Sequence, residues 1–553
     1  MTIARTLHYP LAAVSGAILV FAFPRWNVEV CVWLWLIPLL SVLWLSEVRK
    51  RRAFALGYLA GLCFFVPNLS WLRHSSRVIS GAVDDRWMGW PVELMGWGAV
   101  AGMTLFLSLY FAVWAVFASK FAKPRRSVLL HGSVVDVSLE CLRSAALAGF
   151  AWVALEWLRG WVFTGFGWNG LGVGLHQNKL LIQMADCIGV AGVSFLPVFM
   201  VCALFIVVLR IVLHAKHQKP RRWYFDLVGA MAVLIAWASY GINKLSLEGE
   251  VESVPVRVAM VQLNIPQAVR WSGESTVDIY HRYADLTRLY AEPRDGTKAS
   301  PVDLVVWPES ALGLPYYHPD HPQYFNDLLA LGDYSLLTGC DVLEPAGESH
   351  VSAALFNKGW DSSQLYHKVH LVPFGEYLPL RPILGPILEG ILPSDFDHGS
   401  STEPLTLAKP DIQIIPLICF EDTDGNLARK FVRDQPQLIV NMTNDGWFLH
   451  SHQTEQHTAN AIFRAIELRR SMVRACNTGV TCVIDDKGRI TSRLHDPETG
   501  DTFIEGVLPA TIAVAKSPPL TLYASWGDWF AMLSLALCVL AYSSALIAAR
   551  RSA

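Results

Sequence analysis

The chain has 553 residues, of which 53% are hydrophobic and only 17% are charged, and it contains 21 tryptophans. Soluble domains usually carry about 25% charged residues, so this composition indicates a membrane protein. The net charge of −2 gives no indication of a nucleic-acid partner, and we expect none.

Apolar segments long enough to cross a bilayer recur along the chain. A helix needs about 20 mostly apolar residues for this. The first segment has no small-x-small cleavage site and a second apolar run follows at once, so we interpret it as a retained span rather than a signal peptide. The eight expected spans are Pro10–Phe23, Val30–Leu45, Phe54–Leu72, Leu94–Phe121, Ala145–Phe163, Val190–Leu213, Phe225–Ile242 and Trp526–Ala549.

Basic residues follow every second span. They lie at residues 49–52, 120–126 and 216–222, and Arg550 and Arg551 follow the last span. Because short cytoplasmic loops carry an excess of lysine and arginine, we expect both termini to be cytoplasmic. The long segment between the seventh and eighth spans is then outside.

Two features near the fifth span have more than one interpretation. The outside loop Phe163–Gly172, which contains Trp168, is rich in glycine and aromatic residues. It fits either an interfacial aromatic belt or a re-entrant, lipid-contacting loop. Glu156 and Arg159 share a helix face. Ionisable residues at this depth are often functional, but at a helix end they can also simply pair or reach the interface.

The segment from Glu252 to Pro518 has the composition of a soluble α/β domain. Alternating β-branched runs and amphipathic stretches predict layered sheets covered by helices. The expected helices include Thr276–Ala291 and Gln453–Arg470. The expected strands are Val256–Leu263, Leu304–Trp307, Ser335–Thr338, Ile412–Ile418, Leu438–Met442 and Thr481–Asp485.

Three residues at predicted strand ends form a candidate active site: Glu309, Lys368 and Cys419. Each alone has an ordinary explanation, as a turn carboxylate, a strand-edge lysine or a buried thiol. Together they suggest chemistry, because ligands bind at the carboxyl edge of α/β sheets. A thiolate is the reactive form of cysteine, a carboxylate can accept its proton, and an ammonium can stabilise an oxyanion.

No metal or cofactor is implied by the sequence. The ten cysteines are scattered, with no C-x-x-C pair and no His/Cys cluster at metal-ligand spacing. Walker A and Rossmann motifs are absent from the sequence.

The segments around these residues are WPES, YHKVHLVPFGEYLP and ICFED. In this order they resemble the Glu-Lys-Cys signature of the nitrilase, or carbon–nitrogen hydrolase, superfamily. The longer likeness is to the apolipoprotein N-acyltransferase family. It includes VQLNIPQ at residues 261–267, NDGWF at 444–448, RAIE at 464–467 with RA at 474–475, and EWLRG at 156–160.

This resemblance implies an eight-span membrane bundle joined to a nitrilase-like αββα sandwich. The expected domains are residues 1–245 with seven spans, 246–520 as the periplasmic catalytic domain, and 521–553 with the eighth span and a short cytoplasmic tail. The implied location is the bacterial inner membrane. We expect a monomer.

The resemblance also implies residue roles. Glu309 becomes the general base, Lys368 the oxyanion stabiliser and Cys419 the nucleophile, with Glu376 and Glu421 as supporting carboxylates.

Four aromatic residues are candidates for substrate binding. Trp271 and Trp447 are expected near the substrate entrance, and Trp168 is added from the outside loop. Phe420 stands where the family commonly has tyrosine, so we expect it to act by packing.

The implied reaction is acyl transfer from a membrane phospholipid, through a thioester on Cys419, to the α-amino group of the S-diacylglyceryl cysteine at the N-terminus of an apolipoprotein. Ping-pong kinetics would follow. One alternative is a membrane-tethered amidase or nitrilase acting on a small amide, which uses the same three residues. A transporter or lipid-binding protein that has lost catalysis is another, and the intact trio argues against it.

Overall fold

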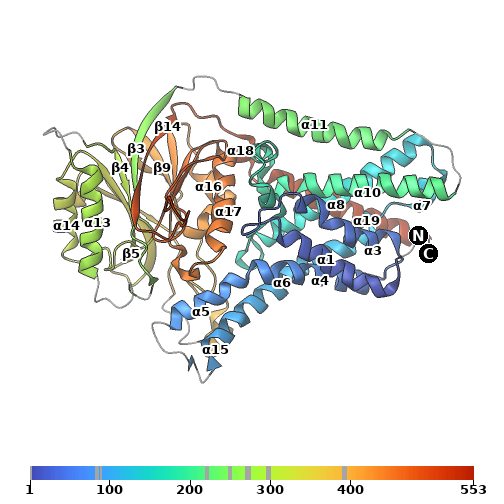
Figure 1. The fold of residues 1–553 in the computed structure, drawn as a ribbon, viewed down its shortest axis with the longest axis horizontal. Coiled ribbons are helices and arrows are strands. Elements are labelled where there is room, and N and C mark those ends of the chain that lie inside the picture. The colour runs from blue at the N-terminus through green and yellow to red at the C-terminus, as the bar shows by residue number, and fades with distance from the viewer. Residues whose placement is uncertain are drawn as a thin grey trace. The chain divides into compact units, whose positions relative to one another are not determined.

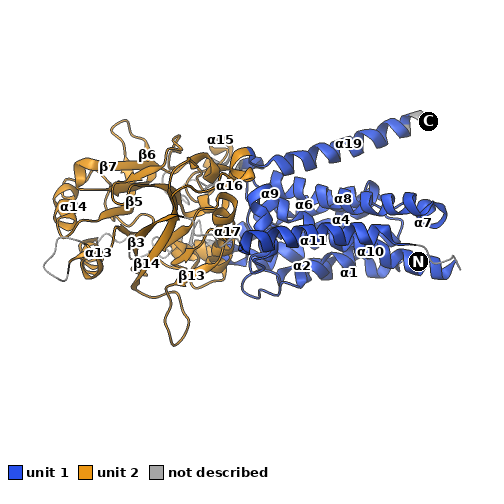
Figure 2. Cartoon of the chain, turned by 90° about the horizontal axis from the view of Figure 1, so that it is seen from above, with its two compact units in different colours: residues 1–73, 94–247, 526–553 blue, residues 74–93, 248–525 orange. Residues whose placement is uncertain are grey.

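The chain folds into two compact units in the computed structural model (Figure 2). Unit 1 comprises residues 1–73, 94–247 and 526–553, and unit 2 comprises residues 74–93 and 248–525. The structure describes residues 3–80, 86–87, 90–217, 223–246, 252–267, 269, 276–293, 300–388 and 395–552.

Unit 1 is built from helices (Figure 1). Close packing in it depends on small residues: a Cβ on Gly16 of α1 would lie 2.0 Å from the carbonyl oxygen of Ala60 in α4. The helices are η1 (Arg5–Leu7), α1 (His8–Val20), α2 (Cys31–Leu34), α3 (Leu36–Leu45), α4 (Lys50–Asn68), η2 (Ser70–Leu72), α6 (Val92–Lys120), α7 (Arg126–His131), α8 (Val134–Arg159), η3 (Val162–Thr164), η4 (Leu171–Leu175), η5 (Leu181–Met184), α9 (Ala185–Val193), α10 (Phe195–Lys216), α11 (Phe225–Ser246) and α19 (Trp529–Ser552).

Five of the described helices are long and apolar enough to cross a membrane: α6, α8, α10, α11 and α19. A sixth span results if α4 is counted with the helical segment Ser70–Val78, to which it is bent by 48°. Helices occupy all eight expected places, but the count of eight spans is not confirmed. The helices at the first two expected places are short: α1 has 13 residues, and the apolar helix Cys31–Leu45 has between 10 and 17.

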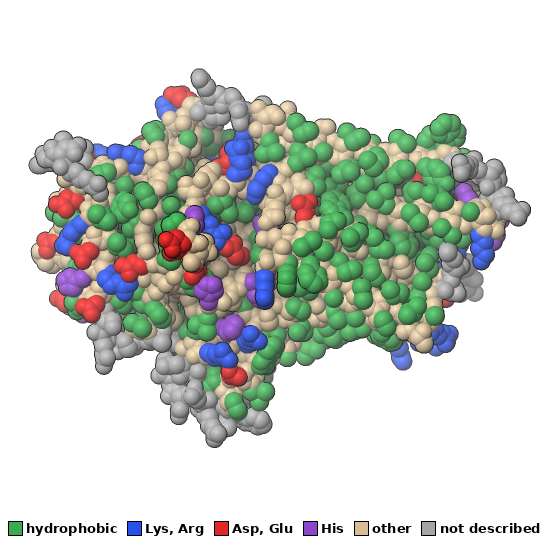
Figure 3. Space-filling model, viewed as in Figure 1, with side chains coloured by type: hydrophobic (Ala, Val, Ile, Leu, Met, Phe, Trp, Pro, Cys, Tyr) green, Lys and Arg blue, Asp and Glu red, His purple; other side chains and the backbone are tan. Residues whose placement is uncertain are grey.

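The outer surface of unit 1 matches a lipid environment. On the face drawn in Figure 3, hydrophobic side chains cover the helices with few charges among them. Arg210 of α10 and Asp226 of α11 are both buried, and they form an ion pair at 2.6 Å. Such pairing is expected because an unpaired charge is costly at membrane depth. Exposed apolar side chains include Leu105, Val208, Ile211, Ile235 and Leu540.

Unit 2 contains two six-stranded sheets, which confirms the expected α/β domain with two sheets. In each sheet three neighbouring strands are parallel and the outer ones add antiparallel pairs. One sheet has the order β14 (Gly506–Ala515), β3 (Ser253–Gln262), β4 (Leu304–Val306), β5 (Ser335–Leu343), β6 (Ser349–Phe356), β7 (Ser363–His367). The other has the order β13 (Ile490–Arg493), β12 (Cys482–Ile484), β11 (Met472–Cys476), β10 (Gln437–Thr443), β9 (Ile412–Ile418), β8 (Leu405–Leu407).

Helices cover the outer faces of the two sheets (Figure 1). Tyr283 of α13 stacks on Trp307 with ring centroids 4.5 Å apart, in a core that also contains Phe325 of α14. Expected helices 276–291 and 453–470 match α13 and α17 closely. A small two-stranded sheet pairs β1 (Arg86–Trp87) with β2 (Trp90–Pro91). The helical segments of unit 2 are α5 (Arg73–Ser80), α13 (Thr276–Ala291), α14 (His321–Leu329), η6 (Trp360–Ser362), α15 (Arg381–Leu388), η7 (Cys419–Thr423), α16 (Gly425–Ala428), η8 (Arg429–Phe431), η9 (Asp445–Phe448), α17 (Gln453–Leu468) and α18 (Leu522–Trp526). The last residue of α18 belongs to unit 1.

Candidate active site

Three chain segments that follow strands bring Glu309, Lys368 and Cys419 together. Glu309 follows β4 after a Trp-Pro pair, Lys368 directly follows β7, and Cys419 directly follows β9. Since β6 is antiparallel to both of its neighbours, β7 runs in the same direction as β5 and β4. The glutamate and the lysine therefore leave the same edge of one sheet, and the cysteine comes from the other sheet.

Lys368 is completely buried between two carboxylates. Its Nζ lies 2.5 Å from Oε1 of Glu376 and 3.5 Å from Oε1 of Glu309. Burial alone would lower the pKa of the ammonium, but Glu376 and Glu309 outweigh it and hold the pKa well above its ordinary value. Glu376 is itself fixed, because its Oε2 accepts a hydrogen bond from the backbone N–H of Val372 at 2.8 Å. The site thus holds a buried ammonium that is positioned by two carboxylates.

Glu309 has the properties of a proton acceptor at neutral pH. It is 7% exposed, and burial raises its pKa to about 7 although the nearby Lys368 opposes the shift. It is close enough to Cys419 for its charge to act on the thiol. A base works best when its pKa lies near the operating pH.

Cys419 occupies a tight turn between β9 and η7. Its backbone φ is +51°, in the left-handed region that non-glycine residues rarely adopt. The turn is held by Asn441 of β10, whose Nδ2 donates to the carbonyl oxygen of Cys419 at 3.1 Å. Burial, and then the charge of Glu309, raise the pKa of the thiol well above its ordinary value. The resting thiol is therefore neutral and needs a base to become nucleophilic.

Glu421 joins the segment after β7 to the turn after β9. Its Oε1 accepts hydrogen bonds from Tyr366 Oη at 2.8 Å and from the backbone N–H groups of Val369 at 2.7 Å and His370 at 3.0 Å. Its Oε2 accepts from the N–H of Ile418 at 2.8 Å. The two joined segments carry Lys368 and Cys419, so this buried carboxylate fixes the spacing of these two residues.

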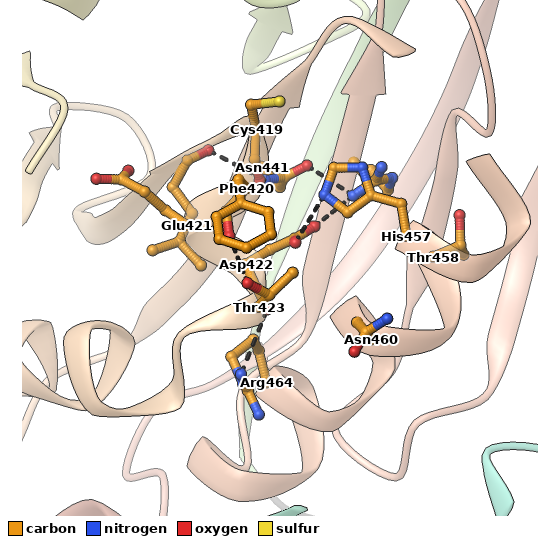
Figure 4. Close-up of polar contacts among 12 residues, drawn as sticks. Cys419, Phe420, Glu421, Asp422, Thr423, Asn441, His457, Thr458, Asn460 and Arg464 are labelled. Carbon is orange, nitrogen blue, oxygen red and sulfur yellow. Dashed lines mark hydrogen bonds and ion pairs between the residues drawn. The ribbon is translucent and has the colours of Figure 1, made fainter. Parts of the chain in front are cut away.

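A second buried network lies behind the cysteine turn, centred on His457 of α17 (Figure 4). Its Nε2 lies 2.9 Å from Asp422 Oδ1 and its Nδ1 lies 2.9 Å from Asp445 Oδ1. Arg474 of β11 pairs with Asp422 and, at 3.3 Å, with Asp445. Arg474 also donates to Asn441 at 3.0 Å, and through Asn441 the network reaches the turn that carries Cys419.

The sequence provided little indication of this network. Asp445 and Arg474 belong to the NDGWF and RA segments, which were noted only as motifs, and His457 lies within a stretch whose pattern indicated only an amphipathic helix.

The charges around His457 set its protonation state. Burial and Arg474 lower the pKa of His457, but the charges of Asp422 and Asp445 outweigh them and raise it to about 9. The imidazole is thus a cation at neutral pH.

The aromatic candidates lie in different parts of the chain. Phe420 follows the cysteine, is almost buried, and packs edge-on against His370 with ring centroids 5.7 Å apart. Trp447 lies in η9, in unit 2. Trp168 belongs to unit 1, where it is buried beside Trp71, with centroids 5.3 Å apart. Trp271 lies outside the described residues.

The described residues contain no group of three or more His, Cys, Asp or Glu side chains that could hold a metal ion. All ten cysteines are free. The arrangement therefore supports thiol chemistry in which a carboxylate manages the proton and an ammonium stabilises negative charge.

Comparison with family models agrees with this description. The carbon-nitrogen hydrolase model matches residues 257–517. The protein therefore carries a carbon–nitrogen hydrolase domain, which lies in unit 2. A model of the apolipoprotein N-acyltransferase N-terminal domain matches residues 15–204. The apolipoprotein N-acyltransferase of Geobacter metallireducens is 31% identical over 542 residues, covering 96% of this chain and 93% of that one. That of Methylococcus capsulatus is 31% identical over 537 residues, covering 94% and 92%.

The chain therefore belongs to the apolipoprotein N-acyltransferase family, and it is an acyltransferase. Among solved structures, XC1258 from Xanthomonas campestris, a CN-hydrolase superfamily protein, is similar with 15% identity and a TM-score of 0.34, over 47% of this chain and 91% of that chain. A carbon-nitrogen hydrolase from Helicobacter pylori G27 gives 15% identity and a TM-score of 0.34, over 47% and 89%.

Proposed function

We propose that the protein transfers an acyl chain from a membrane phospholipid to the N-terminal amino group of an apolipoprotein, with Cys419 as the nucleophile. The observation that carries this assignment is the setting of Glu309, which lies 3.5 Å from Lys368 and whose charge, after burial, raises the pKa of the Cys419 thiol. One carboxylate is thus placed to take the thiol proton beside a fixed cation.

In the first half-reaction, the sulfur of Cys419 forms a bond to the carbonyl carbon of a phospholipid ester. Glu309 accepts the thiol proton, and the ammonium of Lys368 stabilises the oxyanion. The ester C–O bond then breaks and Glu309 passes the proton to the leaving oxygen. Lysophospholipid departs and a thioester remains on the enzyme.

In the second half-reaction, the α-amino group of an S-diacylglyceryl cysteine attacks the thioester. The N–C bond forms, the C–S bond breaks, and Glu309 carries the proton from the amine to the sulfur. The product is an N-acylated lipoprotein with a free Cys419 thiol, and no cofactor is consumed. Since the two substrates react in separate steps, ping-pong kinetics follow.

We assign supporting roles to residues that contact or adjoin Glu309, Lys368 and Cys419. Glu376 orients the lysine, and Glu421 keeps the lysine segment and the cysteine turn at a fixed spacing. Phe420 packs beside the nucleophile in place of the tyrosine common in the family. We assign the three tryptophans at 168, 271 and 447 to substrate contact, on the likeness of their segments to the family's motifs and loop.

The membrane topology we propose has eight spans. The short α1 and the Cys31–Leu45 segment supply two of them, and the bent α4 supplies another. The basic residues after every second span favour cytoplasmic termini in a bacterial inner membrane and a periplasmic catalytic unit. We further propose that the protein acts as a monomer.

Intact-protein mass spectrometry after incubation with phospholipid alone tests the mechanism. Wild type should gain the mass of one acyl chain, and Cys419→Ala should not. Cys340→Ala is the matched control, because Cys340 is a buried thiol of the same unit, and it should be acylated like wild type. An adduct that persists in Cys419→Ala, or none in an enzyme that turns over, overturns the thioester.

The acceptor is tested with the acyl-enzyme and two forms of one diacylglyceryl peptide. The free amine should discharge the thioester and the N-acetylated form should not. Equal discharge by both would contradict amine transfer. Rapid discharge by water with release of free fatty acid would favour the hydrolase alternative.

A further inference from the structure

Thr443 ends strand β10, and the register of the strands places it beside Cys419. Strands β10 and β9 are parallel, and the last residues they pair are Met442 and Ile418. Thr443 and Cys419 follow directly, and neighbouring strands lie about 4.8 Å apart. The other side of Thr443 is fixed by the residue after β11, because its carbonyl oxygen accepts from the N–H of Asn477 at 2.9 Å. Thr443 therefore has a set position next to the cysteine turn.

The side chain of Thr443 lies on the same face of β10 as that of Asn441, because alternate residues of a strand share a face. Asn441 contacts the cysteine turn, since its Nδ2 donates to the carbonyl oxygen of Cys419 at 3.1 Å (Figure 4). Thr443 is two residues closer to the carboxyl end of the strand, where the turn begins. Its hydroxyl is thus directed toward the same turn.

The hydroxyl of Thr443 is buried and unused. The residue is completely buried, and its Oγ1 has no hydrogen-bond partner among the residues that the structure describes. Burying a hydroxyl without a partner is unfavourable, and a valine of the same shape would avoid that cost. A fixed donor in such a position is available to a group that gains negative charge during a reaction.

The surroundings of Cys419 give such a donor a role. Burial raises the pKa of the thiol most, the charge of Glu309 raises it further, and Asp445 adds to the rise. Lys368 and the hydroxyl of Thr443 lower this pKa. The ammonium is shared between two carboxylates, whereas the hydroxyl is bonded to no other group in the described chain. The thiolate form of the cysteine therefore has the hydroxyl as an uncommitted donor.

We propose that Thr443 is a further catalytic residue, whose hydroxyl donates a hydrogen bond to the sulfur of Cys419 while that sulfur carries negative charge. This inference rests on the proposed function, in which Cys419 is the nucleophile. In the first half-reaction Glu309 takes the thiol proton, and the hydroxyl stabilises the thiolate while keeping its own proton. In the second, the C–S bond breaks with its electron pair going to the sulfur. The same hydroxyl stabilises that sulfur until Glu309 returns the proton.

Alkylation of Cys419 by iodoacetamide tests the proposal independently of acyl transfer. Cys419 is partly exposed, and its modification is followed by peptide mass spectrometry on the full-length protein in detergent. Thr443→Val should lower the alkylation rate by about tenfold to hundredfold, because the thiolate loses a hydrogen bond to a charged atom. Thr443→Ala should have the same effect without the second methyl group. Thr443→Ser keeps the hydroxyl and should react like wild type.

A matched control is Thr458→Val. Thr458 is a buried threonine of the same unit, but its hydroxyl donates to the carbonyl oxygen of Thr454 at 2.9 Å, so the substitution should leave the alkylation rate unchanged. Wild-type rates in both Thr443→Val and Thr443→Ala overturn the proposal. A serine variant as slow as the valine variant also overturns it, because the cause would then be packing and not the hydroxyl.

Single-turnover acyl addition from phospholipid separates this inference from the proposed function. Thr443→Val should slow acyl addition by a factor similar to that for alkylation, and Thr443→Ser should not slow it. Unchanged acyl addition in Thr443→Val overturns the catalytic role. If wild type forms no acyl-enzyme but its alkylation depends on the hydroxyl, the proposed function fails and the hydrogen bond from Thr443 to the sulfur is upheld.

Discussion

The ammonium of Lys368 lies 2.5 Å from Oε1 of Glu376, closer than to the proposed base. The contact suggests that the ion pair with the lysine and the exchange of the thiol proton belong to two different carboxylates, Glu376 and Glu309. We propose that Glu376 neutralises and orients the cation, so that Glu309 can exchange protons with Cys419. Burial raises the pKa of Glu309 to about 7, since the nearby Lys368 opposes the rise only in part and the charge of Glu376 adds to it.

Glu376→Gln should slow formation of the acyl-enzyme by about tenfold to hundredfold, because a displaced oxyanion stabiliser typically costs this much. The measurement is the single-turnover rate of acyl addition, followed by mass. Glu498→Gln, at an exposed carboxylate of the same unit, should have no effect. A Glu376→Gln rate equal to wild type would show that the contact has no part in catalysis.

The rate of acyl-enzyme formation should depend on the ionisation of Glu309. Its pKa is about 7 and the carboxylate is the active form, so the rate should rise about tenfold per pH unit below 7 and level off above it. Glu309→Gln should lower the plateau by about 10²–10⁴-fold and remove the dependence. A wild-type profile that is flat from pH 5 to 8 would contradict the assignment of the base.

Glu421→Gln should lower both stability and reactivity. An amide retains one acceptor oxygen but turns an N–H₂ group toward a backbone donor, and a buried clash of this kind costs about 1–3 kcal/mol. Thermal unfolding in detergent should report the loss. The rate of Cys419 alkylation by iodoacetamide should change as well, while Glu403→Gln at the surface should change neither. Altered stability with unaltered alkylation would mean that the carboxylate holds the fold but not the site.

The His457 network predicts a stability that depends on pH. The folded-state pKa of about 9 lies above the ordinary value of 6.5, so the folded form binds the extra proton. Its contribution is complete below pH 6.5 and is lost as the pH rises through 9, by up to about 3 kcal/mol. Unfolding by denaturant should show this decline in wild type, and His457→Gln should be less stable and lack it. A decline of equal size in His457→Gln would assign the effect to other groups.

Much of the site was readable in the sequence because its chemistry lies at strand ends. Glu309, Lys368 and Cys419 each follow a strand, as predicted, but Glu309 and Lys368 leave one sheet and Cys419 leaves the other, so their meeting also depends on how the two sheets pack. The helix at 276–291 was equally readable, since its periodicity is local. Strands such as β6 and β14 were not anticipated, because their pairing depends on partners far along the chain.

By itself, the sequence determined the membrane character, the two-part organisation and the order of the three reactive residues, since composition and local patterns carry this information. Only the tertiary structure shows which group each buried carboxylate contacts. The bonds of Glu421 reach residues more than 50 positions away, and His457 meets Asp422 across α17 and the cysteine turn. Likewise, the sequence placed Glu156 and Arg159 on one helix face, and only the structure shows that Ser194 and the backbone of Leu171 donate hydrogen bonds to this carboxylate. Long-range packing sets these partnerships, because a side chain can satisfy only the groups that folding places within its reach.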